Sequence, residues 1–539
     1  MSTQDVGNFL IKYSEMNRNL PPLIEAMVRP EFYADHPPEV KLRQTHISYV
    51  FLAGGFAYKV KKAIQFPFVD YSTLEKRHHF CAEEVRLNRR LATRTYLYTV
   101  RICQTKNAFS LEEHPLATNR IVEYAVKMNR LPEQRLLSSL IRQESVQMNH
   151  VVAIANKLAV VHQHAPGEKA LTYGSQSAIA SKVSDNFTDT RCFIGRTISR
   201  HSFDTIATYS EAFMNEHSAL LASRVATGRV REGHGDLRAE HICLLDDDIE
   251  IFDCLEFDEG LRYNDLASEL GFLSMDLDFL GEPRSAAKLE SAYASATQDP
   301  SLATLLPFYK CYRAYVRGKV ESLKSDEREV SERERRLATS QALRYFYLSS
   351  RYARGKSRPM VVIVCGMIAT GKSTIAWLLS ALTGFAVLSS DRVRKDLAGV
   401  APTAHKTNDY QQGIYSEEFT RLTYERLLAT AENRLAIGEG AIIDATFGKP
   451  QQRQQFLALA SRFNIPVLFV ECRADESTIA NRLQERKKAN NEISDANWEI
   501  YQRMRRGFAS FSDLPENCRL PINTENELLA ALSKLEMRF

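Results

Sequence analysis

A run of eight residues in the second half of the chain has the composition of a loop that holds phosphate groups. The run fits the pattern G-x-x-x-x-G-K-[S/T] and consists of Gly366, Met367, Ile368, Ala369, Thr370, Gly371, Lys372 and Ser373. In such a loop the backbone N–H groups bind phosphate oxygens, the lysine adds a positive charge, and the serine hydroxyl is a ligand for Mg²⁺. An apolar run precedes the loop, and a helical pattern begins at Thr374. The sequence therefore predicts that these residues and Thr374 bind the triphosphate of ATP, with Ser373 on Mg²⁺.

Carboxylates end two later apolar runs. Asp391 follows the run 385–388 and is itself followed by Arg394, while Asp444 ends the run 441–443. Because the carboxyl ends of strands in open α/β sheets face the ligand crevice, we expect Asp391 to accept a proton from an acceptor hydroxyl. We expect Arg394 to hold an acidic or phosphorylated substrate, and Asp444 to order Mg²⁺ or bind substrate. Helix caps and solvated charges are the alternative explanation for these residues.

Arginines on the later helices are candidates for contacts with the substrate and the transferring group. Arg453 lies on the helix after Asp444 and is expected to contact substrate. Arg482 and Arg486 are four residues apart, so they share one helix face and are placed to cover the phosphoryl group. A solvated basic helix that continues into Lys487 is the alternative.

The first half of the chain carries a second set of residues suited to phosphoryl transfer. In the segment 233–241, Asp236 stands two residues after His234 and five before His241. This spacing matches a kinase catalytic loop, in which the aspartate accepts the proton of the acceptor hydroxyl. Asp253 ends a short apolar run and is the expected Mg²⁺ ligand, with His241 as a second candidate ligand.

Residues upstream of this segment complete the pattern of a nucleotide site. Lys59 lies on a predicted strand after a glycine turn, as a phosphate-binding lysine should, and Glu84 on the next helix is its expected partner. Lys61 falls on the same strand face, and we favour Lys59. The segment 121–124, which includes Glu123, is the expected hinge whose backbone meets adenine.

Two kinds of architecture are needed to position these groups. The first half begins with short runs rich in β-branched and aromatic residues, continues with a helical pattern at 74–91, and is dominated by helices from Leu136 onward. The short runs are 40–44, 49–53 and 56–60. After Pro359 the chain alternates apolar strands with helices, which predicts an α/β fold with a parallel sheet. The four apolar strands are 360–365, 385–388, 441–443 and 467–470.

The domain organisation follows from these changes of pattern. Pro21-Pro22 is expected to end an N-terminal helical segment, 1–34, and a basic, proline-containing break at 354–359 separates the two halves. We therefore expect an α+β kinase-like domain at 35–355 and a P-loop domain at 356–539.

The motifs of the second half resemble those of the small P-loop kinases, which include polynucleotide 5′-hydroxyl kinases, zeta toxins and chloramphenicol phosphotransferase. The similar motifs are GMIATGKST, SSDRVRK, DATF and RLQER. This resemblance implies that Asp391 is a general base, that Arg394 contacts substrate, and that Arg482 and Arg486 are lid arginines.

The first half resembles the aminoglycoside phosphotransferase and choline kinase family, which has a protein-kinase-like fold. The resemblance covers about 35–345 and implies structural roles for His162 and for Asp265, which would anchor the catalytic loop. As a whole the chain resembles bacterial fusions of an aminoglycoside phosphotransferase-like domain with a P-loop ATP-binding domain of the AAA type. Acidic residues at 256–259 would suit a cationic substrate, or they form a solvated acidic loop.

Two residues depart from these families. Ala369 stands where P-loops often have glycine, and His241 stands where the kinase family has asparagine. Mg²⁺ prefers oxygen ligands, and an imidazole suits softer metals better. A kinase-like scaffold without activity of its own is therefore the alternative for the first half.

The composition sets limits on partners and compartment. The 539 residues carry 70 Lys and Arg against 66 Asp and Glu, a formal net charge of +4 that does not indicate nucleic acid, although 392–395 and 482–488 form local basic runs. Nine scattered cysteines without a CxxC pair suit a reducing cytoplasm, and no apolar run has the length of a membrane span.

Together these features predict a cytoplasmic phosphotransferase that uses ATP and Mg²⁺ and acts on a hydroxyl of a small molecule or nucleotide. The alternatives are a polynucleotide or RNA 5′-hydroxyl kinase with a non-catalytic N-terminal module, and a nucleotide-gated regulatory ATPase.

Overall fold

A computed structural model describes most of the chain and divides it into two compact units. The described residues are 20–66, 69–104, 108–112, 120–327, 330–399, 416–489, 498–525, 529, 533, 535, 536 and 538. One unit takes in the described residues up to Lys182 together with Met214–Lys310, and the other takes in Val183–Phe213 and the chain from Cys311 onward. The units therefore divide at 183, 214 and 311, whereas the sequence pattern changes near 355.

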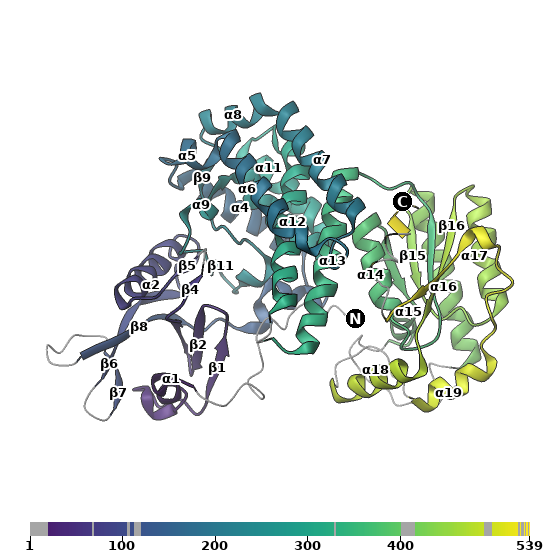
Figure 1. Ribbon diagram of the computed structural model, residues 1–539, viewed down its shortest axis with the longest axis horizontal. Helices are drawn as coiled ribbons and strands as arrows, with labels where there is room; N and C mark the ends of the chain where they lie inside the picture. Colours follow the sequence, from purple (N-terminus) through teal and green to yellow (C-terminus); the bar gives the residue numbers. More distant parts are fainter. Residues whose placement is uncertain are drawn as a thin grey trace. The chain divides into compact units, whose positions relative to one another are not determined.

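The first unit contains a six-stranded antiparallel sheet (Figure 1). Its strands, in spatial order, are β1 (Val40–Gln44), β2 (Ser48–Ala53), β3 (Phe56–Lys61), β8 (Arg120–Asn129), β6 (Tyr96–Gln104) and β7 (Phe109–Glu112). Helix α2 (Leu74–Asn88) packs on β6 and β8, and the Thr73 side chain caps it by accepting a hydrogen bond from the Lys76 N–H. A two-stranded hairpin, β4 (Gln65–Phe66) and β5 (Val69–Asp70), precedes α2.

A helix begins at Pro21-Pro22, and the helix predicted to end there lies outside the described residues. Pro22 begins α1 (Pro22–Met27), because proline is favoured in the first turn, where its missing N–H costs no hydrogen bond. A short 3-10 turn, η2 (Pro30–Phe32), follows it. The rest of the helical segment expected at 1–34 lies mainly outside the described residues.

Helices dominate the chain from Leu137 to Arg354, as predicted. They are α3 (Leu137–Arg142), α4 (Met148–His164), α5 (Ala170–Gly174), α6 (Gln176–Thr190), α7 (Arg200–Glu216), α8 (Ser218–Ala226), α9 (Glu259–Arg262), α10 (Leu266–Phe279), α11 (Pro283–Thr297), α12 (Leu302–Asp326) and α13 (Glu332–Arg354). Four short strands interrupt them: β9 (Val230–Glu232), β10 (Ile242–Leu244), β11 (Ile249–Ile251) and β12 (Tyr263–Asp265). The β10–β11 hairpin separates the candidate catalytic loop from Asp253.

The P-loop region is a five-stranded parallel sheet with helices on both faces (Figure 1). Its strands, in spatial order, are β14 (Ala386–Ser389), β15 (Ala441–Asp444), β13 (Val361–Cys365), β16 (Val467–Arg473) and β17 (Arg519–Asn523). Its helices are α14 (Lys372–Thr383), α15 (Ser390–Leu397), α16 (Glu417–Ala436), α17 (Pro450–Arg462), α18 (Glu476–Ala489) and α19 (Trp498–Gly507).

Strand β13 is buried on both faces, as a central strand of a parallel sheet should be. Its five residues, Val361–Cys365, have no exposed area, and alternate residues pack into a core with α16 and α17. The α/β fold with a parallel sheet predicted for the second half is confirmed, and the first half has the predicted α+β arrangement of an antiparallel sheet followed mainly by helices.

Strand β17 is the element of this sheet that the apolar pattern did not predict. It contains Pro521 and only two apolar residues besides, so its sequence does not read as a buried strand. It pairs only with β16, at the edge of the sheet, where a residue without an N–H is tolerated.

Helix α13 belongs to the same compact unit as the P-loop and packs along α14. The Arg344 guanidinium lies 5.1 Å from the centre of the Trp377 ring, and Arg354 donates a hydrogen bond of 3.1 Å to the Leu382 carbonyl. Near the carboxyl terminus, Glu536 accepts hydrogen bonds from Ser199 (2.6 Å) and Ser202 (2.8 Å) at the start of α7. These contacts join helices from the middle of the chain to the P-loop region.

Candidate active sites

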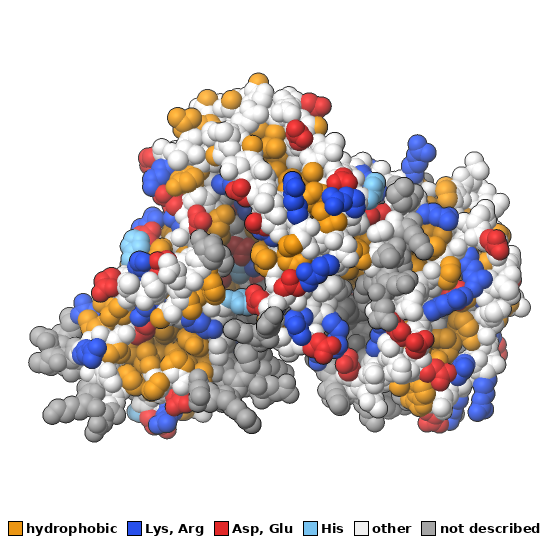
Figure 2. Space-filling view, in the orientation of Figure 1, with side chains coloured by type: hydrophobic (Ala, Val, Ile, Leu, Met, Phe, Trp, Pro, Cys, Tyr) orange, Lys and Arg blue, Asp and Glu red, His pale blue; other side chains and the backbone are white. Residues whose placement is uncertain are grey.

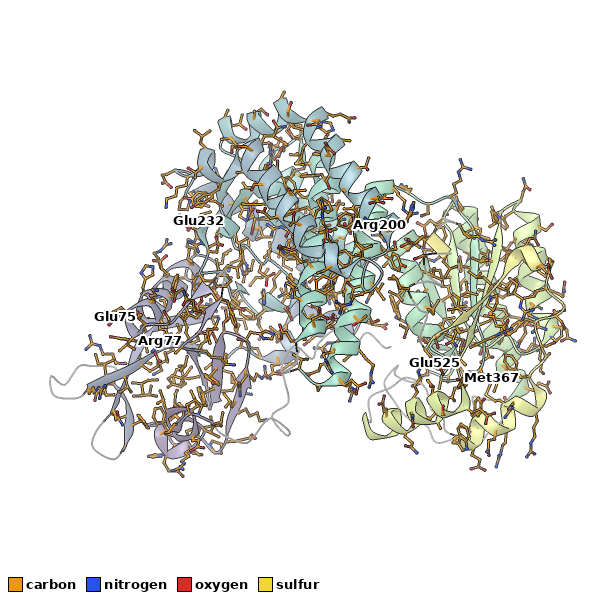
Figure 3. All side chains as sticks on the ribbon, in the orientation of Figure 1. Glu75, Arg77, Arg200, Glu232, Met367 and Glu525 are labelled. Carbon is orange, nitrogen blue, oxygen red and sulfur yellow. The ribbon has the colours of Figure 1, made fainter. Side chains whose placement is uncertain are left out.

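The phosphate-binding loop connects the end of β13 to the start of α14. Gly366 has φ = 132°, and a Cβ on it would lie 2.4 Å from the Cys472 carbonyl oxygen, so only glycine fits there. Lys372 donates a hydrogen bond of 2.7 Å to the carbonyl of Met367, which Figure 3 labels. Its ammonium group therefore lies against the backbone of the loop, where a bound phosphate oxygen would replace the carbonyl as acceptor.

Ala369 lies in the left-handed region, with φ = 60°. Residues other than glycine rarely adopt this conformation, and at functional sites it stores strain of about 1–3 kcal/mol. The alanine noted in the sequence therefore has the backbone conformation that glycine usually supplies.

Two carboxylates lie beside the loop at the carboxyl edge of the sheet. Ser373 donates a hydrogen bond of 2.7 Å to Asp444, and Asp391 is close enough for its charge to affect Asp444. Burial raises the pKa of Asp444 and the Asp391 charge adds to this, although Lys372 and Ser373 act in the opposite direction. A hydroxyl and a carboxylate at this spacing are oxygen donors that suit Mg²⁺, which favours the metal role over the substrate role among the two predicted for Asp444.

The structure contradicts the expected substrate role of Arg453. Its side chain has no exposed area and donates hydrogen bonds to both carboxylate oxygens of Asp513 and to the carbonyls of Phe447 and Ser510. Because its three nitrogens are engaged in the interior, Arg453 holds the loop after β15 against the segment after α19.

The other arginines fall in different surroundings. Arg394 is largely buried and donates to Thr420 on α16 at 3.2 Å. Arg482 donates to the Ala369 carbonyl (3.1 Å) and to the carbonyl of Thr524 (3.0 Å), so it contacts the phosphate loop from outside. The side chain of Arg486 lies outside the described residues. Substrate binding by Arg394 and phosphoryl contact by the arginines of α18 remain predictions.

We expect Gly366→Ala to destabilise the unit that contains the P-loop by about 2–4 kcal/mol, since overpacking and backbone strain each cost about 1–3 kcal/mol. The new methyl group would meet the Cys472 carbonyl. Urea unfolding followed by circular dichroism measures the effect. Gly507→Ala is the control, because no atom lies within 4 Å of its added Cβ. Equal stability of the two variants would show that the loop tolerates a side chain at 366.

The candidate site of the first unit is built around Lys59 on β3. Lys59 forms ion pairs with Glu84 of α2 at 2.8 Å and with Asp253 at 2.7 Å. Burial lowers the pKa of Lys59, but the two carboxylates raise it further, so the lysine stays charged. The structure thus brings together three predicted residues that lie up to 194 positions apart in the chain.

Lys61 lies on the same strand face and shares Glu84 with Lys59, but its second partner is different. It is wholly buried and pairs with Glu84 and Glu256, and its ammonium lies 4.9 Å from the Tyr71 ring centre. Lys59 is therefore the lysine that reaches Asp253, the carboxylate predicted to bind the metal ion. Because Glu256 is bound to Lys61 and Glu259 to Lys169, neither carboxylate provides the acidic surface considered for a cationic substrate.

The catalytic-loop segment carries Asp236 beside an arginine that the sequence did not single out. Arg238 donates to both oxygens of Asp236, at 2.9 and 2.7 Å, and is itself buried. Arg238 therefore fixes the position of the Asp236 carboxylate. It also occupies both carboxylate oxygens, which are the atoms that would accept a proton. In the sequence, the only sign of this pair is that Arg238 stands two residues after Asp236.

Glu269 holds the backbone of this segment. It accepts hydrogen bonds from the N–H groups of His234 (2.8 Å) and Gly235 (3.1 Å). The expected anchor, Asp265, instead caps α10 and pairs with Arg224. His162 has the structural role that the resemblance implies, since it bonds to the Tyr293 hydroxyl and burial lowers its pKa to about 3.

The expected hinge at 121–124 is wrong. These residues lie inside β8, where they pair with β6, and Glu123 forms a two-oxygen ion pair with Arg77 of α2. Arg77 is labelled in Figure 3. Ile121, Val122 and Tyr124 favour a strand, and the chain leaves the sheet only after Asn129.

Comparisons with known proteins agree with this architecture. The AAA domain family AAA_33 matches residues 361–511. The uncharacterized proteins Rv2004c of Mycobacterium tuberculosis and Mb2027c of Mycobacterium bovis are each 30% identical over 464 residues, which cover 86% of this chain and 89% of theirs.

Solved structures also show similarity, at low identity. A choline/ethanolamine kinase family protein from Mesorhizobium loti is 11% identical with a TM-score of 0.36, covering 62% of this chain and 98% of that one. A gluconokinase from Sinorhizobium meliloti 1021 is 18% identical with a TM-score of 0.23, covering 34% of this chain and 97% of that one. The carboxy-terminal part of the chain matches the AAA domain model, and given the identity and coverage of the mycobacterial proteins, this chain belongs to their family.

Proposed function

We propose that the P-loop site transfers the γ-phosphoryl group of ATP to a hydroxyl of a small molecule or nucleotide. The observation that carries this proposal is the grouping of Ser373, Asp444 and Asp391 beside the phosphate loop. The first pair suits a phosphate-bound cation, and the third residue is a carboxylate at the edge where an acceptor would approach.

The residues suggest an in-line transfer. The acceptor oxygen forms a bond to the γ-phosphorus while the bond to the bridging oxygen of ADP breaks, and the acceptor proton passes to Asp391. Lys372 and the loop N–H groups stabilise the charge on the phosphate oxygens. Mg²⁺ at Ser373 and Asp444, when bound, would neutralise further phosphate charge.

A small acceptor is favoured over a polynucleotide. Two residues of the basic run at 392–395, Arg394 and Lys395, are only 8% and 2% exposed, so they do not form a surface track for nucleic acid. On the face shown in Figure 2, acidic and basic side chains lie interspersed. We place the reaction in the cytoplasm, as all nine cysteines lie in the described part of the chain and none forms a disulfide. No described helix has the length and apolarity to cross a membrane.

Asp391→Asn tests the proposal. We expect transfer from radiolabelled ATP to fall about 10²- to 10⁴-fold, the usual contribution of a general base, while ATP affinity changes little. The assay uses a panel of metabolite hydroxyl compounds and 5′-hydroxyl oligonucleotides. Asp396→Asn is the control, since Asp396 lies exposed on the same helix. Full activity of Asp391→Asn would exclude this residue as the base.

The same assay separates the two sites. If the Asp236→Asn variant transfers phosphate as well as the wild type, the first unit is a scaffold for the P-loop site. Transfer confined to oligonucleotides would favour the polynucleotide kinase, and ATP hydrolysis without any acceptor would favour a regulatory ATPase.

A further inference from the structure

The His241 side chain in the first unit has a fixed orientation. Its Nδ1 lies 2.8 Å from the Asp236 carbonyl oxygen, and its ring is stacked against His234 with centroids 5.8 Å apart. A carbonyl oxygen only accepts, so Nδ1 carries the hydrogen of this bond. In the neutral ring the lone pair is then on Nε2. Histidines that bind metals are commonly held in this way, with one nitrogen donating to a carbonyl and the other on the ion.

The Nε2 atom faces a carboxylate oxygen that is placed to share an ion with it. It lies 3.7 Å from Oδ2 of Asp253, while the other oxygen, Oδ1, accepts from Lys59 at 2.7 Å. Transition-metal bonds to nitrogen and oxygen are about 2.0–2.2 Å long, so two ligands of one ion lie at most about 4.2 Å apart. A separation of 3.7 Å therefore allows one ion to contact both atoms. Asp253 has φ = 64°, a strained conformation for aspartate that holds the carboxylate at this place.

The donor set does not match Mg²⁺, the usual metal of nucleotide sites. Mg²⁺ demands near-octahedral oxygen coordination, whereas imidazole suits the first-row transition metals. Among the described residues no group of three or more His, Cys, Asp and Glu side chains surrounds a metal position. A nucleotide phosphate or water would have to complete the coordination.

We propose that the first unit binds nucleotide together with a first-row transition-metal ion, in preference to Mg²⁺, and that His241 Nε2 and Asp253 Oδ2 are its protein ligands. This site is separate in the chain from the oxygen donors Ser373 and Asp444, which suit Mg²⁺. The one polypeptide thus carries two nucleotide sites with different metal preferences.

Pulsed electron paramagnetic resonance of the full chain with Mn²⁺ and ADP tests the proposal directly. We expect modulation from a directly bound ¹⁴N nucleus in the wild type and its loss in His241→Asn. The control is His164→Asn, because His164 also uses Nδ1 on a backbone carbonyl, that of Val160, but is exposed. Loss of the ¹⁴N signal in His241→Asn but not in the control supports the proposal. Absence of the signal in the wild type, or its survival in a folded His241→Asn, overturns it.

Calorimetric titration gives a second readout. His241→Asn is expected to weaken Mn²⁺ binding in the presence of ADP by at least about 10-fold, without weakening Mg²⁺ binding, because asparagine supplies an oxygen. Equal losses for the two ions would contradict the proposed selectivity. Neither measurement depends on phosphoryl transfer, so failure of the function proposed for the P-loop would leave this result unaffected.

Discussion

Lys372→Met is expected to lower phosphoryl transfer by about 10²- to 10³-fold, the usual cost of losing one preorganised charge at a reacting phosphate. Its ammonium lies against the loop backbone, 2.7 Å from the Met367 carbonyl, where it can meet the phosphates. Methionine has a similar length but no charge, so the loop should keep its shape. Steady-state kinetics with radiolabelled ATP and thermal unfolding measure the two effects.

Lys356→Met is the matched control for this prediction. Lys356 is exposed and precedes β13, so it lies at the amino edge of the sheet, opposite the phosphate loop. We expect its variant to retain wild-type transfer. Undiminished transfer by a folded Lys372→Met protein would mean that the reaction does not take place at this loop.

Arg453→Leu is expected to destabilise the unit that contains the P-loop by about 2–4 kcal/mol, because a buried backbone carbonyl left without its donor costs about 1–3 kcal/mol and the charge-assisted bonds to Asp513 are lost as well. Leucine would leave the Asp513 carboxylate and two backbone carbonyls without their donor. The Arg453 guanidinium also lies 4.8 Å from the centre of the Phe511 ring, and that contact would be lost as well. Urea unfolding monitored by circular dichroism measures the change.

Arg462→Leu controls for the loss of a positive charge on the same helix. Its side chain is 58% exposed and pairs with Glu432 at the surface, where an ion pair contributes at most about 1 kcal/mol. If Arg453→Leu kept wild-type stability but raised the KM for an acceptor, the assignment of Arg453 as a structural residue would be wrong.

The phosphate loop could be predicted from sequence because its residues are contiguous. One glycine-rich segment between an apolar strand and a helix specifies the loop and both of its neighbours. The contact among Lys59, Glu84 and Asp253 could also be predicted, although these residues lie far apart in the chain. Their order along the chain resembles that of a known fold, and the fold determines which elements lie side by side.

The roles of single charged residues were harder to predict. Arg453 and Glu123 are both charged and near predicted sites, yet both side chains are largely buried and form ion pairs, with Asp513 and Arg77 respectively. The partners lie 60 and 46 residues away in the chain, so local spacing carries no sign of them. Arg238 was missed although it stands only two residues after Asp236, the predicted catalytic residue, because this spacing alone does not show that the two side chains form a pair.

The packing of α13 on α14 has a consequence for anyone who isolates the P-loop part. A fragment that starts at 356 would lack Arg344 and Arg354, and so would uncover the side of α14 that carries Trp377. Starting at 311 would restore those contacts but leave behind the serines that bind Glu536. Both fragments are therefore expected to be less stable than the intact chain. Enzyme assays should use the intact chain.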